Sequence, residues 1–151
     1  MIVDIVASET LDLRQRVLRP FATQKECVYA CDDLPETKHL GVRDSAQENR
    51  VLAILTMTPE APPFDTSYSG IRLRGVAVDP DYHGNGYGSK LLQTAIEYSQ
   101  HEKLLVWCNA RLTARQFYER YGFASYGEIF MYPSEPRIGE HIVMFYDKHL
   151  S

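Results

Sequence analysis

The stretch Asp79-Pro-Asp-Tyr-His-Gly-Asn-Gly-Tyr-Gly-Ser-Lys90 decides how this chain folds, because here a glycine-rich turn leaves an apolar strand and opens an amphipathic helix. Gly84, Gly86 and Gly88 allow backbone N–H groups to point into one concavity without obstruction by Cβ atoms. The N-terminus of the helix adds roughly half a positive charge to the same place. The turn therefore predicts an anion site of a form that suits a pyrophosphate.

The residues on either side of the turn predict a strand, a helix and a second strand. Residues 71–78 alternate and then become fully apolar, as a strand does when it enters a core. Arg72 and Arg74 are expected on a solvated or edge face, with contact to the substrate as the alternative. Residues 91–96 carry an apolar stripe at helical spacing, and 104–108 are a continuous apolar run typical of a buried strand. This order predicts a parallel strand pair.

The other segments predict a mixed α/β chain without an internal boundary. No repeat or low-complexity linker divides the sequence, and 151 residues correspond to one domain on a prior of about 150 residues per domain, so we expect a single domain over 1–151. The remaining expected elements are a strand at 2–6, a helix ending before Pro20, a helical or irregular stretch through Tyr29, an antiparallel hairpin of 39–43 and 51–57, a helix capped by Gly122, and strands at 124–132 and 141–146.

Composition excludes several classes of protein. Hydrophobic residues make up 44% and charged residues 24%, which is ordinary for a globular domain, and the net charge of −4 argues against a nucleic-acid-binding face. No run of 18 apolar residues predicts a membrane span, and the first residues do not predict a signal peptide. Cys27, Cys31 and Cys108 lack zinc-ligand spacing, so we expect no metal site and a reducing, cytoplasmic compartment.

Two nucleotide-binding templates fail on spacing at the glycine-rich turn. A P-loop that began at Gly84 would need Gly, Lys and Ser or Thr where Ser89, Lys90 and Leu91 stand. A Rossmann fingerprint would need Gly or Ala at the position of Ser89. A nucleotide-binding protein is therefore the weaker alternative, and it predicts that ATP or NAD binds the turn.

Two motifs resemble the Gcn5-related N-acetyltransferase (GNAT) superfamily. His83-Gly-Asn-Gly-Tyr-Gly88 is similar to its Arg/Gln-x-x-Gly-x-Gly/Ala signature, and Ala114-Arg-Gln-Phe-Tyr-Glu-Arg-Tyr-Gly-Phe123 is similar to its downstream helix and turn, in the same order and spacing. His83 replaces the family's Arg or Gln, which weakens one expected phosphate contact but leaves the backbone cradle. The resemblance implies a mixed, mostly antiparallel central sheet with a splayed parallel strand pair and about four helices.

The resemblance also implies a reaction, in which acetyl-CoA gives its acetyl group to an amine by direct attack in a ternary complex. Tyr118 would serve the departing thiolate; because a phenol near pKa 10 holds its proton more tightly than a thiol near 8.5, a hydrogen bond is favoured over full proton transfer. The implied cofactor-binding residues are Val76, Ala77, Val78, His83, Gly84, Asn85, Gly86, Tyr87, Gly88, Ser89 and Asn109.

Other roles stay open at this point. The attacking amine must lose a proton, and Glu128, Glu140, His141 or ordered water are the candidate bases. The basic residues expected at the cofactor rim, where they could meet the 3′-phosphate of CoA, are Lys90, Arg111 and Arg115.

The acceptor is expected to meet the N-terminal helices and the loop 59–69, which carries Phe64, Asp65 and Tyr68. Together with the acidic net charge, these residues favour a cationic small-molecule or peptide amine with an apolar body. The resemblance further implies strand edges that pair into a homodimer. The alternative function is a non-catalytic acyl-CoA-binding or regulatory module on the same fold, which would bind CoA without turnover.

Overall fold

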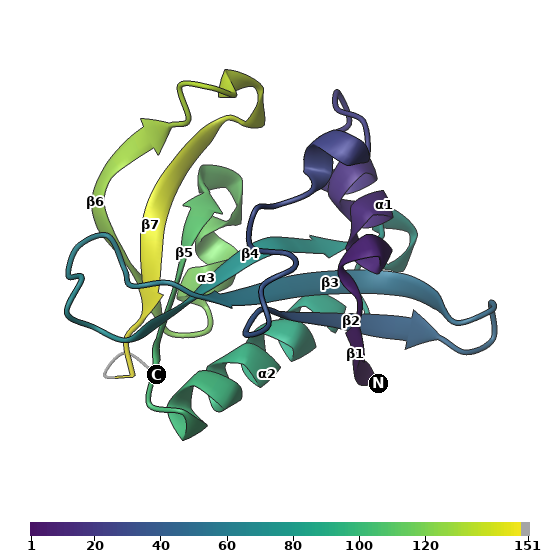
Figure 1. The fold of residues 1–151 in the computed structure, drawn as a ribbon, viewed down its shortest axis with the longest axis horizontal. Helices are drawn as coiled ribbons and strands as arrows, with labels where there is room; N and C mark the ends of the chain where they lie inside the picture. Colours follow the sequence, from purple (N-terminus) through teal and green to yellow (C-terminus); the bar gives the residue numbers. More distant parts are fainter. Residues whose placement is uncertain (149–151) are drawn as a thin grey trace. The chain divides into compact units, whose positions relative to one another are not determined.

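The computed structural model describes residues 1–148, which contain a seven-stranded sheet (Figure 1). Its strands are β1 (Ile2–Ile5), β2 (Lys38–Asp44), β3 (Arg50–Pro59), β4 (Gly70–Val78), β5 (Leu105–Arg111), β6 (Phe123–Met131) and β7 (Glu140–Tyr146). They follow the order β1-β2-β3-β4-β5-β7-β6, and β4 and β5 are the parallel pair of a mostly antiparallel sheet. The expected mixed fold is therefore confirmed.

The helices are α1 (Leu11–Leu13), α2 (Tyr87–His101) and α3 (Arg115–Glu119). α1 lies inside a longer helical stretch that ends at Leu18, before Pro20, as expected. The stretch through Tyr29, expected to be helical or irregular, is irregular and contains one 3-10 turn at Lys25–Cys27, so residues 1–148 hold three α-helices where about four were expected. The physical reason is that the buried apolar residues of this stretch, Ala22 and Cys27, lie five positions apart and form no stripe at helical spacing. Within the described chain, no helix is long and apolar enough to cross a membrane.

Contacts divide the chain into two compact units. Unit 1 consists of residues 1–58 and 74–95, and unit 2 of residues 59–73 and 96 onward. The expectation of one domain over 1–151 stays a prediction, and its last three residues lie outside the described chain.

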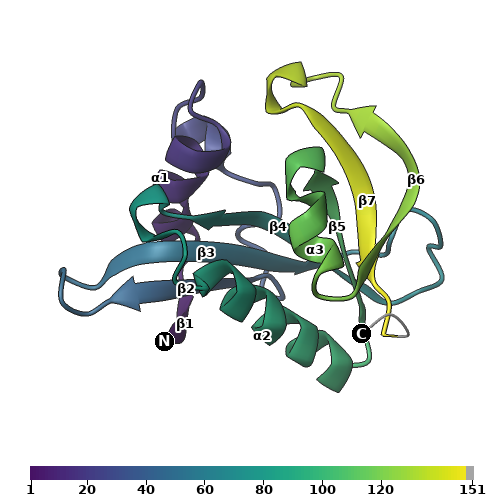
Figure 2. The same ribbon diagram turned by 180° about the vertical axis from the view of Figure 1, so that it is seen from behind.

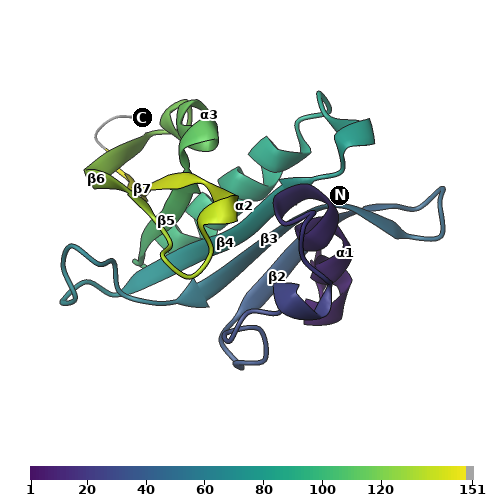
Figure 3. The ribbon, with the colours of Figure 1, turned by 90° about the horizontal axis from the view of Figure 1, so that it is seen from above.

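Unit 1 is built from β1 to β3, the second half of β4 and the first part of α2. Ile5, Leu13, Ile54 and Ala77 are buried together in one apolar cluster, which joins β1, α1, β3 and β4. The α1 stretch and α2 lie on opposite faces of β2–β4 (Figure 3). Because Ala77 is part of this cluster, the second half of β4 is fixed by the core of unit 1.

Unit 2 contains the first half of β4, the strands β5 to β7 and α3. The parallel register of β4 and β5 joins Gly70–Leu73 to Leu105–Cys108 and stops there, although β4 itself continues to Val78. Trp107 is 2% exposed and donates its indole N–H to the carbonyl of Glu60 at 2.8 Å. α3 lies beside β5 (Figure 2).

Candidate functional site

The glycine-rich turn of unit 1 has the backbone shape of an anion cradle. Gly84 has φ of +89° and Gly86 of +75°, and a Cβ added at either position would meet nothing within 4 Å. α2 begins at Tyr87, and the N–H of Lys90 donates to the carbonyl of Gly86 at 3.0 Å. The first N–H groups of a helix have no acceptor within the helix, so this exposed turn presents donors to an anion.

Asp79, 1% exposed, anchors the beginning of this turn. Its carboxylate accepts from the N–H of Asp81 at 3.0 Å and forms ion pairs with Arg50 at 2.6 Å and Arg16 at 3.2 Å. Burial alone would raise the pKa of Asp79, but the Asp81 N–H and the two guanidiniums hold it below its ordinary value. The Asp79 N–H also donates to the carbonyl of Leu52 at 2.8 Å, which ties the turn to β3.

A bulge interrupts β4 at Gly75, a residue that the sequence analysis did not single out. Gly75 has φ of +60° in the interior of a strand, which is the left-handed geometry of a bulge. A Cβ there would lie 3.0 Å from the hydroxyl of Tyr29 and 3.3 Å from Nε of Arg14. Gly75 stands directly before Val76, the first of the β4 residues that were expected to contact the cofactor.

Tyr118 lies on α3 in unit 2 and is 6% exposed. Its ring packs against Phe117 and Phe123, with centroid distances of 5.2 and 5.3 Å. Burial, together with the neighbouring Cys108 thiol, raises the pKa of Tyr118 well above its ordinary value. Burial also raises the pKa of Cys108, to about 12. Both groups are therefore protonated at neutral pH, and Tyr118 is suited to donate a hydrogen bond rather than to release its proton.

Comparison with known proteins now decides the family. The Acetyltransferase (GNAT) domain family matches residues 28–125. The chain is also 34% identical over 143 residues to the "Uncharacterized N-acetyltransferase YitI" of Bacillus subtilis, which covers 93% of this chain and 91% of the relative. The chain belongs to the GNAT acetyltransferase family.

Solved structures share the fold of this GNAT chain. An acyl-CoA N-acyltransferase from Pseudomonas aeruginosa has a TM-score of 0.71 at 20% identity, with 97% of this chain and 99% of that chain covered. An aminoglycoside 6′-N-acetyltransferase complexed with coenzyme A has a TM-score of 0.71 at 13% identity, with 96% of this chain and 95% of that chain covered. At these identities the likeness concerns the fold alone.

The predicted cofactor residues of this GNAT chain fall into both units. The β4 segment 76–78 and the turn 83–89 lie together in unit 1, whereas Asn109 and Tyr118 lie in unit 2. Asn85 uses its side-chain amide inside the turn, where it donates to the carbonyl of Tyr82 at 2.9 Å. The turn is therefore stiffened by its own side chains, while its backbone faces outward.

A polar cluster around Tyr132 in unit 2 was not foreseen. The Tyr132 hydroxyl accepts from the amide of Asn109 at 2.8 Å and from Arg72 at 3.3 Å. Arg72 also pairs with Glu60 at 3.3 Å, and its side chain is only 14% exposed, so the expected solvated face is wrong for this residue. The sequence signal was present but weak, because an arginine that alternates with apolar residues in a strand does not reveal its partner.

The three candidate bases differ in burial. Glu128 and Glu140 are exposed, and Glu140 lines a cavity of about 350 Å³ with Arg111–Thr113, Ile138 and Gly139. His141 is 4% exposed, and its Nδ1 lies 2.9 Å from the carbonyl of Gly139. Burial lowers the pKa of His141, so its ring is neutral at neutral pH and able to accept a proton. Residues 1–148 contain no group of His, Cys, Asp and Glu side chains that could hold a metal ion.

The basic residues expected at a cofactor rim also separate between the units. Lys90 is exposed beside the turn in unit 1, with its ammonium 5.9 Å from the centroid of the Tyr87 ring. Arg111 and Arg115 lie in unit 2, where Arg115 donates to the hydroxyl of Ser125 at 3.2 Å. Within unit 1, Lys90 is therefore the member of this set beside the cradle.

The loop 59–69, expected to meet the acceptor, is partly committed to packing in unit 2. Phe64 packs against Tyr126 and Phe145, with centroid distances of 4.7 and 5.2 Å. Asp65 accepts from the N–H of Ser67 at 2.9 Å, and the hydrogen bonds from Ser67 lower the pKa of Asp65. Phe64 and Asp65 thus have partners on the neighbouring strands or within the loop, whereas Tyr68 is 52% exposed.

Proposed function

We propose that this GNAT chain transfers an acetyl group from acetyl-CoA to an amine by direct attack in a ternary complex. The observation that carries the proposal is the turn at Gly84 and Gly86, where two left-handed glycines stand at a helix N-terminus with open space in place of Cβ atoms. The aminoglycoside acetyltransferase of the same fold, which was solved with coenzyme A, supports the choice of CoA.

The pyrophosphate is assigned to the backbone of the turn. His83, Gly84, Asn85, Gly86, Tyr87, Gly88 and Ser89 form this cradle, with Asp79 holding its beginning against β3. The carboxylate of Asp79 is paired with two arginines inside unit 1, so it does not repel an incoming phosphate as a free carboxylate would. Lys90 adds a cation one helical turn further on.

The thioester arm is assigned to the β4 segment beyond the bulge. Val76, Ala77 and Val78 follow Gly75, and backbone groups re-aimed by a bulge can bind an extended ligand as a further strand would. Acetyl-CoA supplies the activated acetyl group. Asn109 is assigned a polar contact with the cofactor, and Tyr118 a hydrogen bond to the thiolate that departs. The proton of the attacking amine leaves to Glu128, Glu140, His141 or water.

A ligand titration tests the cofactor assignment. Calorimetry and thermal shift with acetyl-CoA, CoA, ATP and NAD are expected to detect binding of the first two alone, with a higher melting temperature when they are bound. Gly86→Val should lose at least about 100-fold in acetyl-CoA affinity, because the side chain fills the cradle and the left-handed backbone disfavours it.

Gly127→Val is the matched control. Gly127 has φ of +77° and open space around its Cβ position, like Gly86, but it lies on β6 in unit 2. This variant should carry the same backbone strain and keep its acetyl-CoA affinity. Binding of ATP or NAD in place of CoA would show the proposal to be wrong. If CoA binds but no amine causes release of the CoA thiol from acetyl-CoA, the chain is the non-catalytic acyl-CoA-binding module instead.

A further inference from the structure

Two guanidinium groups enclose one aromatic ring in unit 1. The Cζ atom of Arg14 lies 3.7 Å from the centroid of the Tyr29 ring, and that of Arg74 lies 4.0 Å from the same centroid. Two guanidiniums this close to one centroid must occupy opposite faces, because on one face they would overlap. Tyr29 is therefore sandwiched between a residue of the N-terminal helical stretch and a residue of β4.

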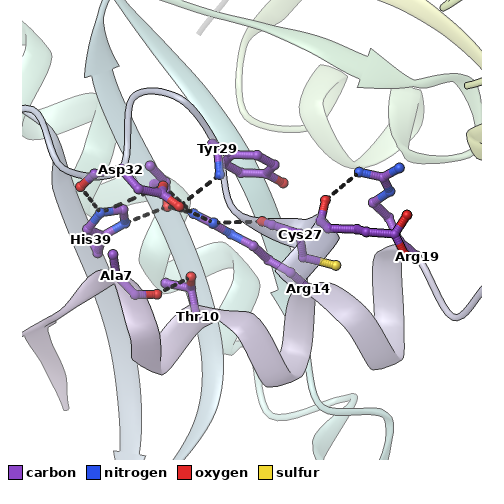
Figure 4. Close-up of polar contacts among 10 residues, drawn as sticks. Ala7, Thr10, Arg14, Arg19, Cys27, Tyr29, Asp32 and His39 are labelled. Carbon is purple, nitrogen blue, oxygen red and sulfur yellow. Dashed lines mark hydrogen bonds and ion pairs between the residues drawn. The ribbon is translucent and has the colours of Figure 1, made fainter. Parts of the chain in front are cut away.

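The inner guanidinium, that of Arg14, is fully neutralised. Arg14 is 0% exposed and donates to both carboxylate oxygens of Asp32, at 2.7 and 3.0 Å, and to the hydroxyl of Thr56 at 2.9 Å. Figure 4 shows its side chain running from the helical stretch to Asp32, with the Tyr29 ring beside it. Asp32 accepts a further hydrogen bond from the N–H of Tyr29 at 2.9 Å. This inner pair is a rigid base for the ring.

The outer guanidinium, that of Arg74, is not neutralised. Among residues 1–148, its side chain has neither an ion pair nor a hydrogen bond, and its contact is the stacking on Tyr29. The ionised groups that act on the pKa of Tyr29 are Arg14, Arg74 and Asp32, two cations for one carboxylate. The Nε–H of Arg14 is also buried without a partner, and Nε lies 3.3 Å from the position that a Cβ on Gly75 would take. Positive charge and N–H donors are thus in excess beside the bulge.

We propose that Arg74 binds a carboxylate of the acceptor, so that the substrate is an amino acid or a similar small amine that carries a carboxylate. A guanidinium held flat by stacking presents a fork that matches a carboxylate in two hydrogen bonds. One guanidinium with no second free cation beside it fits a single negative charge better than a phosphate. This inference rests on the proposed function, since it concerns the acceptor of the same reaction.

The position of Arg74 also suits this role. Arg74 stands two residues before Val76, which begins the segment assigned to the thioester arm, so the Cα atoms of these two residues lie within roughly 7 Å of each other. A carboxylate held by Arg74 would therefore belong to a ligand beside the strand that is assigned to the thioester arm. The net charge of −4, which favours a cationic acceptor, acts over distances that salt screens, whereas Arg74 acts at contact.

Matched acceptors test the inference. For each of several side chains, the amino acid, its amide and the amine without the carboxyl group, such as phenylalanine, phenylalaninamide and phenethylamine, are assayed with acetyl-CoA by thiol release. The wild type is expected to give a kcat/KM at least about 30-fold higher for one or more amino acids than for their amides, as a charge-assisted hydrogen bond requires. Arg74→Gln should reduce this ratio to about 3 or less, and Arg74→Lys should leave an intermediate ratio because it keeps the charge without the fork.

The control variant is Arg43→Gln. Arg43 is another arginine of unit 1; it lies on β2 and forms an ion pair with Glu9 at 2.7 Å. Its loss should leave the ratio of kcat/KM for amino acid and amide unchanged. Calorimetry with acetyl-CoA on each variant shows that the fold is kept. A panel in which no amino acid reacts faster than its amide overturns the inference, as does a ratio that survives Arg74→Gln. If either result is found but amides and simple amines are still acetylated, the proposed function stands and only the inference about Arg74 fails. If no amine causes thiol release from acetyl-CoA, the proposed function fails.

Discussion

Two left-handed regions of unit 1, the bulge at Gly75 and the turn at Gly84 and Gly86, share a backbone geometry but differ in their surroundings. At Gly75 a Cβ would lie 3.0 Å from the hydroxyl of Tyr29, whereas at Gly84 and Gly86 it would meet nothing within 4 Å. The first glycine is therefore required by the protein's own packing. At the other two only the left-handed backbone favours glycine, as it also does at Gly127, so their assignment to a ligand rests on their place at the N-terminus of α2.

This difference separates stability from binding. A residue enclosed by its own protein should affect the free energy of unfolding first, and a residue in open space should affect ligand affinity first. Gly86→Val and its control Gly127→Val compare two residues in open space. Gly75 and Asp79 are residues enclosed by the protein, and Tyr118 is enclosed but assigned to the ligand.

Gly75→Ala is expected to have the largest effect. The free energy of unfolding should fall by about 3 kcal/mol, since the left-handed backbone is strained by any side chain and the new methyl group lies only 3.0 to 3.3 Å from atoms of Tyr29 and Arg14. Gly127→Ala, which is strained but not crowded, should lose only about 1 kcal/mol. Urea unfolding of both variants measures the difference. Equal losses would mean that the crowding at Gly75 is relieved by small shifts, and the comparison would fail.

Asp79→Asn should follow. The amide can still accept the Asp81 N–H, but the charge that pairs with Arg16 and Arg50 is lost. Both arginines are more than a third exposed, so solvent weakens the two ion pairs. The free energy of unfolding should therefore fall by only about 2 kcal/mol at pH 7. Because the folded-state pKa of Asp79 is lowered, its contribution is complete above about pH 4 and disappears as the pH falls through the folded pKa.

Unfolding experiments across this pH range check the sign. The wild type and Asp79→Asn should differ at pH 7 and converge in acid. Asp12→Asn is the control, because Asp12 pairs with the same Arg16 but is 57% exposed, and it should change stability by no more than about 0.5 kcal/mol. A gap between wild type and Asp79→Asn that widens in acid would contradict the assigned charge state.

The succession of strands along the chain and the glycine turn could be predicted from the sequence, because both depend on patterns local to a few residues. Alternation and apolar runs located β4 and β5, and the spacing of three glycines located the cradle. The stretch through Tyr29, which the sequence left open as helical or irregular, is irregular, since Thr23, Lys25 and Glu26 form hydrogen bonds within a short turn. Local patterns thus leave the structure open where side chains can satisfy the backbone in more than one way.

Contacts between distant residues could not be predicted in this way. Arg14, Tyr29 and Arg74 are separated by many residues and meet only because the N-terminal stretch packs on β4. Arg72 and Arg74 look equivalent in the sequence, yet the first pairs with Glu60 and the second has no carboxylate partner in residues 1–148. The charge balance of a cluster depends on which chain segments meet, and a single sequence does not contain that information.

Tyr118 tests whether an enclosed residue can serve the ligand instead of stability, because it is 6% exposed but assigned to the departing thiolate. Tyr118→Phe keeps the ring that packs on Phe123 and removes only the hydroxyl, so the fold and acetyl-CoA affinity should persist while kcat falls about 10-fold. Tyr126→Phe, at an exposed position on β6, should leave kcat unchanged. Since the pKa of Tyr118 is raised, the wild-type kcat should show no loss from its ionisation near pH 10. If kcat is the same in Tyr118→Phe and the wild type, Tyr118 serves packing alone, and enclosure by itself predicts which residues the ligand needs.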